Sequence, residues 1–148
     1  MDIQLITQKH VLWDNVKEYA RGCGWSSGKI LAEDMEKQRF SDWERVAVLL
    51  EGESLRGYCT IIREEAIPDM PYTPFIGTLY IDESCRGIRL GQRLLTASMD
   101  YLKSLGFEKA YLISDHENLY EKYGFRVIDR RMAPWGREEK VYVQEIRE

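Results

Sequence analysis

The residues most suited to chemistry surround a glycine-containing turn in the second half of the 148-residue sequence. Residues 75–81 form an apolar run of strand length, a polar turn follows, and apolar residues then recur at helical spacing. The first N–H groups of a helix lack intrahelical acceptors, and the helix dipole adds positive potential there. Gly87 and Gly91 let a ligand approach this backbone closely. The segment is therefore suited to binding a pyrophosphate.

The same turn also has a purely structural interpretation, in which its glycines serve turning and tight packing. Other phosphate-binding patterns fit less well. The lysine-containing P-loop is absent, and the three-glycine spacing of the dinucleotide fingerprint is missing. An early glycine loop followed by an acidic ribose-binding residue is missing as well.

A second segment with chemical potential, residues 115–125, directly follows a short apolar run. Its histidine, His116, has an unperturbed pKa of about 6.5, which suits proton transfer near neutral pH. The segment also carries two tyrosines, Tyr120 and Tyr123. The structural alternative is a single helical turn in which Leu119 and the tyrosines are core residues and His116 is a cap.

Together the two segments resemble the GNAT superfamily of acyl-CoA-dependent N-acetyltransferases. Residues 86–91, Arg-Gly-Ile-Arg-Leu-Gly, look like its acetyl-CoA motif, Gln/Arg-x-x-Gly-x-Gly/Ala. Residues 119–125 look like its Leu/Phe-Tyr-Glu-Lys-x-Gly-Phe signature, and the intervening helix–strand pattern also matches. Asp-His at 115–116 and Trp-Gly at 135–136 resemble a bacterial subgroup of small GNAT proteins. The resemblance weakens before Arg45.

The resemblance implies an α/β fold: a GNAT domain over residues 1–148, with a mixed, V-shaped central sheet of six to seven strands and about four helices. Strands 75–81 and 110–113 would splay apart, and the pantetheine arm of acetyl-CoA would lie between them. No metal is implied. The cofactor-binding residues implied are Leu79, Tyr80, Ile81, Arg86, Gly87, Ile88, Arg89, Leu90, Gly91 and Gln92.

The implied reaction is direct transfer of an acetyl group from acetyl-CoA to an amine of a small molecule or peptide. Tyr120 matches the family tyrosine that protonates the departing thiolate, and a backbone N–H near residues 79–81 would polarise the carbonyl. Many relatives carry a basic glutamate on the strand before the glycine motif, but residues 75–81 include no acid. His116 is the substitute we predict, and a water chain is the alternative. Asp82 and Glu83 are weaker candidates.

One residue departs from the family pattern. Arg89 stands where the motif usually has its first glycine, and its side chain could either crowd a phosphate or add a cation to the CoA phosphates. A second function class also stays open, a non-catalytic sensor or assembly protein that binds acyl-CoA. The intact Tyr120 favours an enzyme.

Composition narrows the class of protein. The net charge of −4 argues against nucleic-acid binding. No apolar run approaches the roughly 20 residues of a membrane span, and the start does not read as a signal peptide. The three cysteines, Cys23, Cys59 and Cys85, lie far apart and suit a reducing compartment. We expect a cytoplasmic monomer or homodimer, with Cys85 as a filler rather than a nucleophile, since no histidine lies near it in sequence.

The elements that must position these motifs alternate between strand and helix. Strands linked by helices indicate a mixed sheet with at least one parallel crossover. An acceptor pocket would be built by the early helices and residues 68–73, where Trp13, Trp25, Tyr72 and, later in the chain, Trp135 are either lining or packing residues. The expected strands are 2–6, 45–50, 55–63, 75–81, 110–113, 125–128 and 141–146, and the expected helices are 11–21, one capped by Ser26 or Ser27, 90–105 and 118–123.

Overall fold

A computed structural model describes residues 1–86 and 89–146 of the chain. Its strands form one sheet in the order β1-β2-β3-β4-β5-β7-β6. The strands are β1 (Asp2–Ile6), β2 (Arg45–Glu51), β3 (Ser54–Ile62), β4 (Phe75–Ile81), β5 (Lys109–Ser114), β6 (Arg126–Met132) and β7 (Glu138–Glu145). The helices are α1 (Trp13–Gly22), α2 (Ser26–Glu36) and α3 (Leu90–Ser104), with short 3-10 helices η1 (Glu83–Cys85) and η2 (Tyr120–Tyr123).

The sheet is mixed, as the sequence predicts. Neighbouring strands pair antiparallel throughout, except for β4 and β5, which run parallel. A parallel pair needs a long crossover connection, and α3 supplies it. The expected α/β fold with a mixed sheet of six to seven strands is thereby confirmed, with seven strands among the described residues. About four helices were expected and three α-helices are described, because the expected helix at 118–123 is only the 3-10 helix η2. Among the described helices, none is long and apolar enough to cross a membrane.

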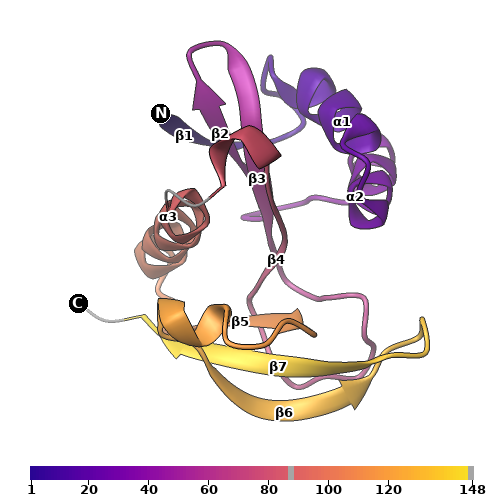
Figure 1. Cartoon of the computed structure of the whole chain (residues 1–148), viewed down its shortest axis with the longest axis vertical. Helices are drawn as coiled ribbons and strands as arrows, with labels where there is room; N and C mark the ends of the chain where they lie inside the picture. Colours follow the sequence, from indigo (N-terminus) through magenta and orange to yellow (C-terminus); the bar gives the residue numbers. More distant parts are fainter. Residues whose placement is uncertain (87–88, 147–148) are drawn as a thin grey trace.

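The helices cover opposite faces of the first half of the sheet (Figure 1): α1 and α2 pack on one face and α3 on the other. Strand β2 explains how both faces are filled. Val46 and Val48 belong to the cluster beneath α1 and α2, while Ala47 and Leu49 belong to the cluster beneath α3. Successive side chains of a strand point to opposite faces, so a continuous apolar run suits a strand buried on both.

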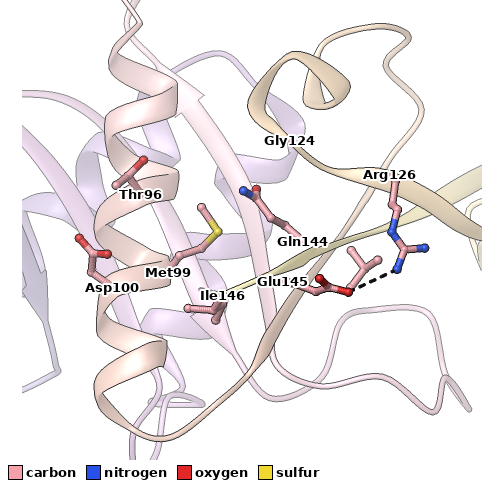
Figure 2. Close-up of a pocket in the computed structure, with 9 residues that line it drawn as sticks. Thr96, Met99, Asp100, Gly124, Arg126, Gln144, Glu145 and Ile146 are labelled. Carbon is pink, nitrogen blue, oxygen red and sulfur yellow. Dashed lines mark ion pairs between the residues drawn. The ribbon is translucent and has the colours of Figure 1, made fainter. Parts of the chain in front are cut away.

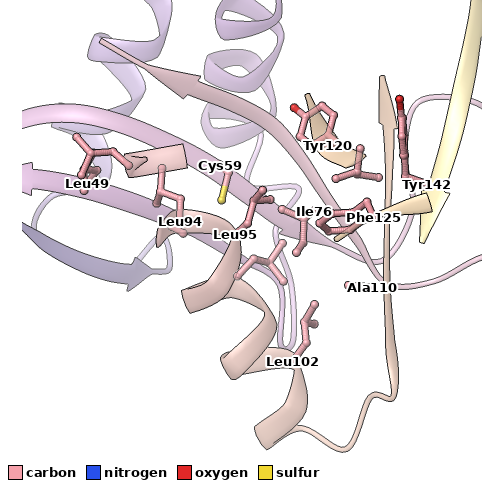
Figure 3. Packing of buried hydrophobic residues seen from close by; sticks show 14 of the residues in the cluster. Leu49, Cys59, Ile76, Leu94, Leu95, Leu102, Ala110, Tyr120, Phe125 and Tyr142 are labelled. Atoms are coloured by element: carbon pink, nitrogen blue, oxygen red, sulfur yellow. The ribbon is translucent and has the colours of Figure 1, made fainter. Parts of the chain in front are cut away.

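Helix α3 is fixed to the sheet by a leucine face. Leu94, Leu95 and Leu102 are at most 1% exposed and pack in one cluster with Leu49 and Ile76 (Figure 3). Burying a leucine side chain contributes about 1.5–3 kcal/mol, so this face holds the helix firmly. Eight residues, including η1, separate β4 from α3 in the sequence. The start of the helix still lies beside the end of that strand, since a Cβ on Gly91 would stand 3.6 Å from Leu79 Cδ2 and 4.0 Å from Ile81 Cγ1.

Some boundaries differ from the sequence expectation. The residue before α2 is Trp25, and no side chain caps that helix. Strand β6 extends to Met132 and β7 begins at Glu138, so this hairpin is longer than apolar residues alone indicate. The physical reason is that β6 forms the edge of the sheet, where a strand needs backbone pairing but no apolar run.

Candidate active site

The two strands at the centre of the sheet part from each other immediately after they meet. β4 and β5 share a single register pair, Phe75 with Tyr111. Beyond it, β4 remains paired with β3 only on its other side, up to Ile81. The splayed, V-shaped sheet implied by the resemblance is therefore present, and its opening lies along the edge of β4 that faces β5 (Figure 1).

A β-bulge interrupts β4 inside this opening. Thr60 of β3 pairs with Gly77 and Tyr58 pairs with Tyr80, so two β4 residues stand opposite one on β3. Thr78, the first of the two, has a φ of +46°, a region that L residues rarely occupy. A bulge leaves its extra residue outside the ladder and redirects the local backbone. Peptide groups at residues 78–79 can thus serve a ligand in the opening.

Helix α3 begins at the same end of β4. No side chain caps its first turn, and the first turn contains no acidic residue. Arg89 precedes the helix with φ +60° and ψ +25°, the left-handed conformation that favours glycine. The backbone at position 89 thus has a conformation that a glycine adopts without strain. Arg89 is exposed, and among the described residues no carboxylate forms an ion pair with it.

The other candidate cofactor residues at this turn differ in their surroundings. Gly91 is buried, and a Cβ placed on it would make only ordinary van der Waals contacts, the nearest at 3.6 Å from Leu79 Cδ2, so the packing of α3 on β4 does not itself require a glycine here. Arg86 is committed to the turn: its Nε donates to the Ile81 carbonyl at 2.9 Å and its guanidinium lies 5.8 Å from the Tyr80 ring. Leu90 is buried, Gln92 is half-buried, and Gly87 and Ile88 lie outside the described residues.

Tyr120 lies in the opening between the splayed strands. Its side chain is 8% exposed and lines a small cavity with Gly77, Thr78 and Leu79 of β4 and with Leu112 and Ile113 of β5. Burial raises the pKa of the Tyr120 hydroxyl above its usual range. The hydroxyl therefore stays protonated at neutral pH, which is the state that a proton donor requires.

His116 lies next to Tyr120, with 6.4 Å between the ring centroids in an edge-on arrangement. Its backbone is firmly held: the N–H donates to Ser114 Oγ at 3.0 Å, and the carbonyl accepts from the Tyr142 hydroxyl at 3.1 Å and from Lys140 Nζ at 3.3 Å. The residue is exposed at the end of β5. The structure thus brings both predicted catalytic residues together, and a base role for His116 stays a prediction.

The sequence of residues 11–125 matches the model of the acetyltransferase (GNAT) family. The chain belongs to the GNAT acetyltransferase family. No curated protein matches the sequence.

Solved structures of GNAT proteins share the fold at low sequence identity. The aminoglycoside 6'-N-acetyltransferase from Enterococcus faecium is 19% identical, with a TM-score of 0.75 over 100% of this chain and 98% of that one. An aminoglycoside 6'-N-acetyltransferase complexed with coenzyme A is 19% identical, with a TM-score of 0.73 over 100% and 98% of the two chains. The NatC complex bound to Gag peptide and CoA is 15% identical, with a TM-score of 0.67 over 99% and 100%.

On the α1–α2 face of this GNAT fold, aromatic rings gather around Tyr80. Its ring stacks on Trp25 at 5.9 Å and on Tyr58 at 5.5 Å between centroids. The Tyr19 hydroxyl donates to Asp82 Oδ2 at 3.5 Å at the edge of this cluster. The Tyr80 side chain is therefore occupied on this face, which leaves its backbone as the part that can meet a cofactor.

The other aromatic residues considered for an acceptor pocket have separate places. Trp13 is a core residue whose indole N–H donates to the Met35 carbonyl at 3.3 Å. Tyr72 stacks on Tyr111 at 5.1 Å between centroids. Trp135 is 51% exposed in the turn between β6 and β7. Among the four, Trp25 is the one that joins the ring cluster beside β4.

One acidic residue near the opening was not expected from the sequence. Glu65 lies between β3 and β4, and its carboxyl occupies the place where a side chain on Gly77 would stand. A Cβ on Gly77 would lie 2.5 Å from Glu65 Oε2 and 3.1 Å from Thr60 Oγ1. The one sequence clue is Gly77 itself, because a glycine inside a strand often marks the close approach of another group.

A larger groove, of about 530 Å³, lies away from this opening, between the later turns of α3 and β7 (Figure 2). Arg126 and Glu145 form an ion pair at 3.8 Å on its wall. It is lined by Thr96, Met99, Asp100, Gly124, Arg126, Val143, Gln144, Glu145 and Ile146. Of the candidate catalytic and cofactor residues that the structure describes, none borders this groove, and those that line a cavity lie at the opening between β4 and β5.

Proposed function

We propose that this GNAT protein transfers an acetyl group from acetyl-CoA to an amine of a small molecule or peptide. The observation that carries the proposal is the place of Tyr120. This tyrosine of the family signature lines the opening between β4 and β5 together with the bulged residues of β4. A tyrosine whose hydroxyl stays protonated and a backbone segment redirected by the bulge thus line the same small cavity.

The residues present fit acetyl-CoA as a substrate. The uncapped amides at the start of α3 suit a pyrophosphate, because they combine unpaired N–H groups with the positive end of the helix dipole. Arg89 stands at this helix start as a cation for a CoA phosphate. The edge of β4 that β5 leaves unpaired beyond Phe75 suits the amide groups of the pantetheine arm.

The chemistry asks three things of the protein: removal of a proton from the acceptor ammonium, polarisation of the thioester carbonyl, and a proton for the thiolate. The free amine forms a C–N bond to the carbonyl carbon as the C–S bond breaks, and the nitrogen then loses one proton, which balances the proton that the thiolate gains. We assign the thiolate proton to the Tyr120 hydroxyl and the carbonyl hydrogen bond to backbone N–H groups near the bulge at residues 78–79. The products are an amide and CoA, with no acyl-enzyme intermediate.

Two observations support an amine as the acceptor. The GNAT structures with similar folds include acetyltransferases of aminoglycosides and a complex bound to a peptide. In this chain, the α1–α2 side of β4 offers aromatic rings and the carboxylate of Asp82, groups that attract a cationic amine.

The proposal is tested in two steps. Ligand that binds only the native state stabilises it by about 2.7 kcal/mol at a hundredfold excess over Kd, so CoA should raise the melting temperature in a concentration-dependent way. Thiol release from acetyl-CoA is then measured with polyamines, aminoglycosides, amino acids and peptides. No melting shift at millimolar CoA would contradict the cofactor assignment. A shift without acetylation of any amine would favour an acyl-CoA sensor.

A further inference from the structure

The amine that accepts the acetyl group binds mainly as an ammonium ion, whose nitrogen has no free electron pair for attack. An alkyl ammonium group has a pKa near that of lysine, about 10.4, so most of it is charged at neutral pH. A base near the thioester must take that proton before the nitrogen can attack. Strand β4, which borders the opening, carries no acidic residue from Phe75 to Ile81.

A carboxyl group nevertheless lies on that strand, because Glu65 places it there from the preceding loop. A Cβ on Gly77 would stand 2.5 Å from Glu65 Oε2 and 3.3 Å from Glu65 Cδ. The absence of a side chain at position 77 is therefore what makes room for the carboxyl. Gly77 lies two residues beyond the Phe75–Tyr111 pair and lines the same cavity as Tyr120.

The carboxyl and the Tyr120 hydroxyl belong to opposite sides of the sheet. Ile76 and Tyr120 are part of the cluster beneath α3, so the next position on β4, Gly77, faces the α1–α2 side. Asp34 of α2 raises the pKa of the Glu65 carboxyl through its charge, which agrees with a place for that carboxyl on the α1–α2 side. A base on one side and an acid on the other can act on the nucleophile and on the leaving group without interfering with each other.

We propose that Glu65 is the general base of this protein and takes the proton of the acceptor ammonium. The inference rests on the proposed function. The N–H bond of the ammonium breaks, its proton moves to a carboxylate oxygen of Glu65, and the freed electron pair forms the C–N bond. Loss of product and return of the proton to water restore the carboxylate.

The surroundings of Glu65 suit this task. Burial raises the pKa of its carboxyl to about 7, the Ala66 N–H acts in the opposite sense, and Asp34 raises the pKa further. Asp34 is paired with Arg39 at 3.0 Å, and β3 contributes the Thr60 hydroxyl. Within the described chain, no cation forms an ion pair with Glu65. A half-buried carboxyl without a cationic partner is costly, and catalytic sites are where such groups occur.

Glu65→Gln is the test variant, since it keeps the shape of the side chain but cannot accept the proton. Glu64→Gln, at the exposed neighbouring residue, is the matched control, and His116→Ala examines the competing base. Thiol release from acetyl-CoA is followed between pH 5 and 9 with kanamycin, spermidine and a lysine-containing dipeptide. We expect kcat/KM of the native protein and of Glu64→Gln to rise with pH through about 7, and the same rise in His116→Ala if Glu65 is the base. Glu65→Gln should no longer show that rise, and its kcat should be about 10²–10⁴-fold lower than that of the native protein.

A relocation variant separates base catalysis from a structural role. Glu65→Gly combined with Gly77→Glu moves the carboxyl onto β4 and removes the Glu65 atoms that a Cβ on Gly77 would meet, while Thr60 Oγ1 would stand 3.1 Å from that Cβ. We expect this double variant to recover at least tenfold over Glu65→Gln. In an NMR titration of the carboxyl carbons, one resonance should change its chemical shift with a midpoint near pH 7, and this resonance should be missing in Glu65→Gln.

The outcomes distinguish the two proposals. If the native protein acetylates none of the three amines, the proposed function is contradicted. If it acetylates one and Glu65→Gln retains the rate and the rise near pH 7, Glu65 is not the base. Loss of the rise in His116→Ala alone would give the role to His116.

Discussion

The Tyr123 hydroxyl lies 3.7 Å from the point where a Cβ on Gly91 would stand. These residues belong to the two motifs that carry the family resemblance, and about thirty residues separate them in the sequence. In the folded chain, η2 therefore closes against the first turn of α3. The contact places Tyr120, at the start of η2, at the same opening as the helix that is suited to bind phosphate.

This contact leads to a prediction for Gly91. A Cβ there would make ordinary contacts with Leu79 and Tyr123, so Gly91→Ala should fold and bind CoA as before, with up to about 1 kcal/mol of added helix stability. Gly91→Glu should lose CoA binding, because it brings bulk and a negative charge to the start of α3. The check is the CoA-induced melting shift, with circular dichroism as the control for folding. Undiminished CoA affinity in a natively folded Gly91→Glu would place the pyrophosphate elsewhere.

Arg89 yields a prediction with two opposite effects. Its left-handed backbone costs a non-glycine residue about 1–2 kcal/mol, so Arg89→Gly should raise the melting temperature of the unliganded protein while Arg89→Ala should not. If its guanidinium meets the 3′-phosphate, both variants should bind CoA about two- to fivefold more weakly, the range of an exposed ion pair. Dephospho-CoA should be little affected. Tighter binding of CoA by either variant would mean that the arginine obstructs the site.

Gly28 gives a prediction about stability. A Cβ on this residue of α2 would overlap the Ala20 carbonyl oxygen and stand 2.8 Å from Cys23 Sγ and 2.9 Å from the Tyr58 hydroxyl. Overpacking typically costs about 1–3 kcal/mol, which exceeds the usual gain of alanine over glycine in a helix. Gly28→Ala should therefore melt several degrees lower. Gly22→Ala, with nothing within 4 Å of the new Cβ, is the matched control. An unchanged melting temperature for Gly28→Ala would contradict the close packing of α1 and α2.

Much of the fold could be predicted from local patterns. Strands such as β2 and β4 carry continuous apolar runs, and α3 repeats leucines at helical spacing, so local sequence reveals them. The edge strand β6 was predicted too short, because residues such as Arg130 and Arg131 pair through the backbone and leave no apolar signal.

The candidate site was predictable where it depends on motifs and unpredictable where it depends on tertiary contacts. Tyr120 and the helix start after Arg89 follow from spacing along the chain. Glu65 does not, because its place over Gly77 is a contact across twelve residues and a loop, and a Glu in a polar loop usually faces solvent. The bulge at Thr78 likewise arises from pairing with β3 and has no local signature.

The central claim is that Tyr120 supplies the proton for the departing thiolate. Tyr120→Phe keeps the ring that packs against Tyr142 at 5.7 Å and removes only the hydroxyl, so the fold should be unaffected. Acid catalysis by a positioned group contributes about 10²–10⁴-fold, so kcat should fall within that range while KM for acetyl-CoA changes little. Tyr123→Phe, a tyrosine of the same 3-10 helix, should retain most of the activity.

The most direct measurement is single-turnover thiol release from acetyl-CoA, with an amine that the native protein acetylates, at a pH where chemistry limits the rate. The account predicts a rate for Tyr120→Phe at least a hundredfold below that of the native protein, with Tyr123→Phe close to native. A Tyr120→Phe protein that releases thiol at a near-native rate would contradict it.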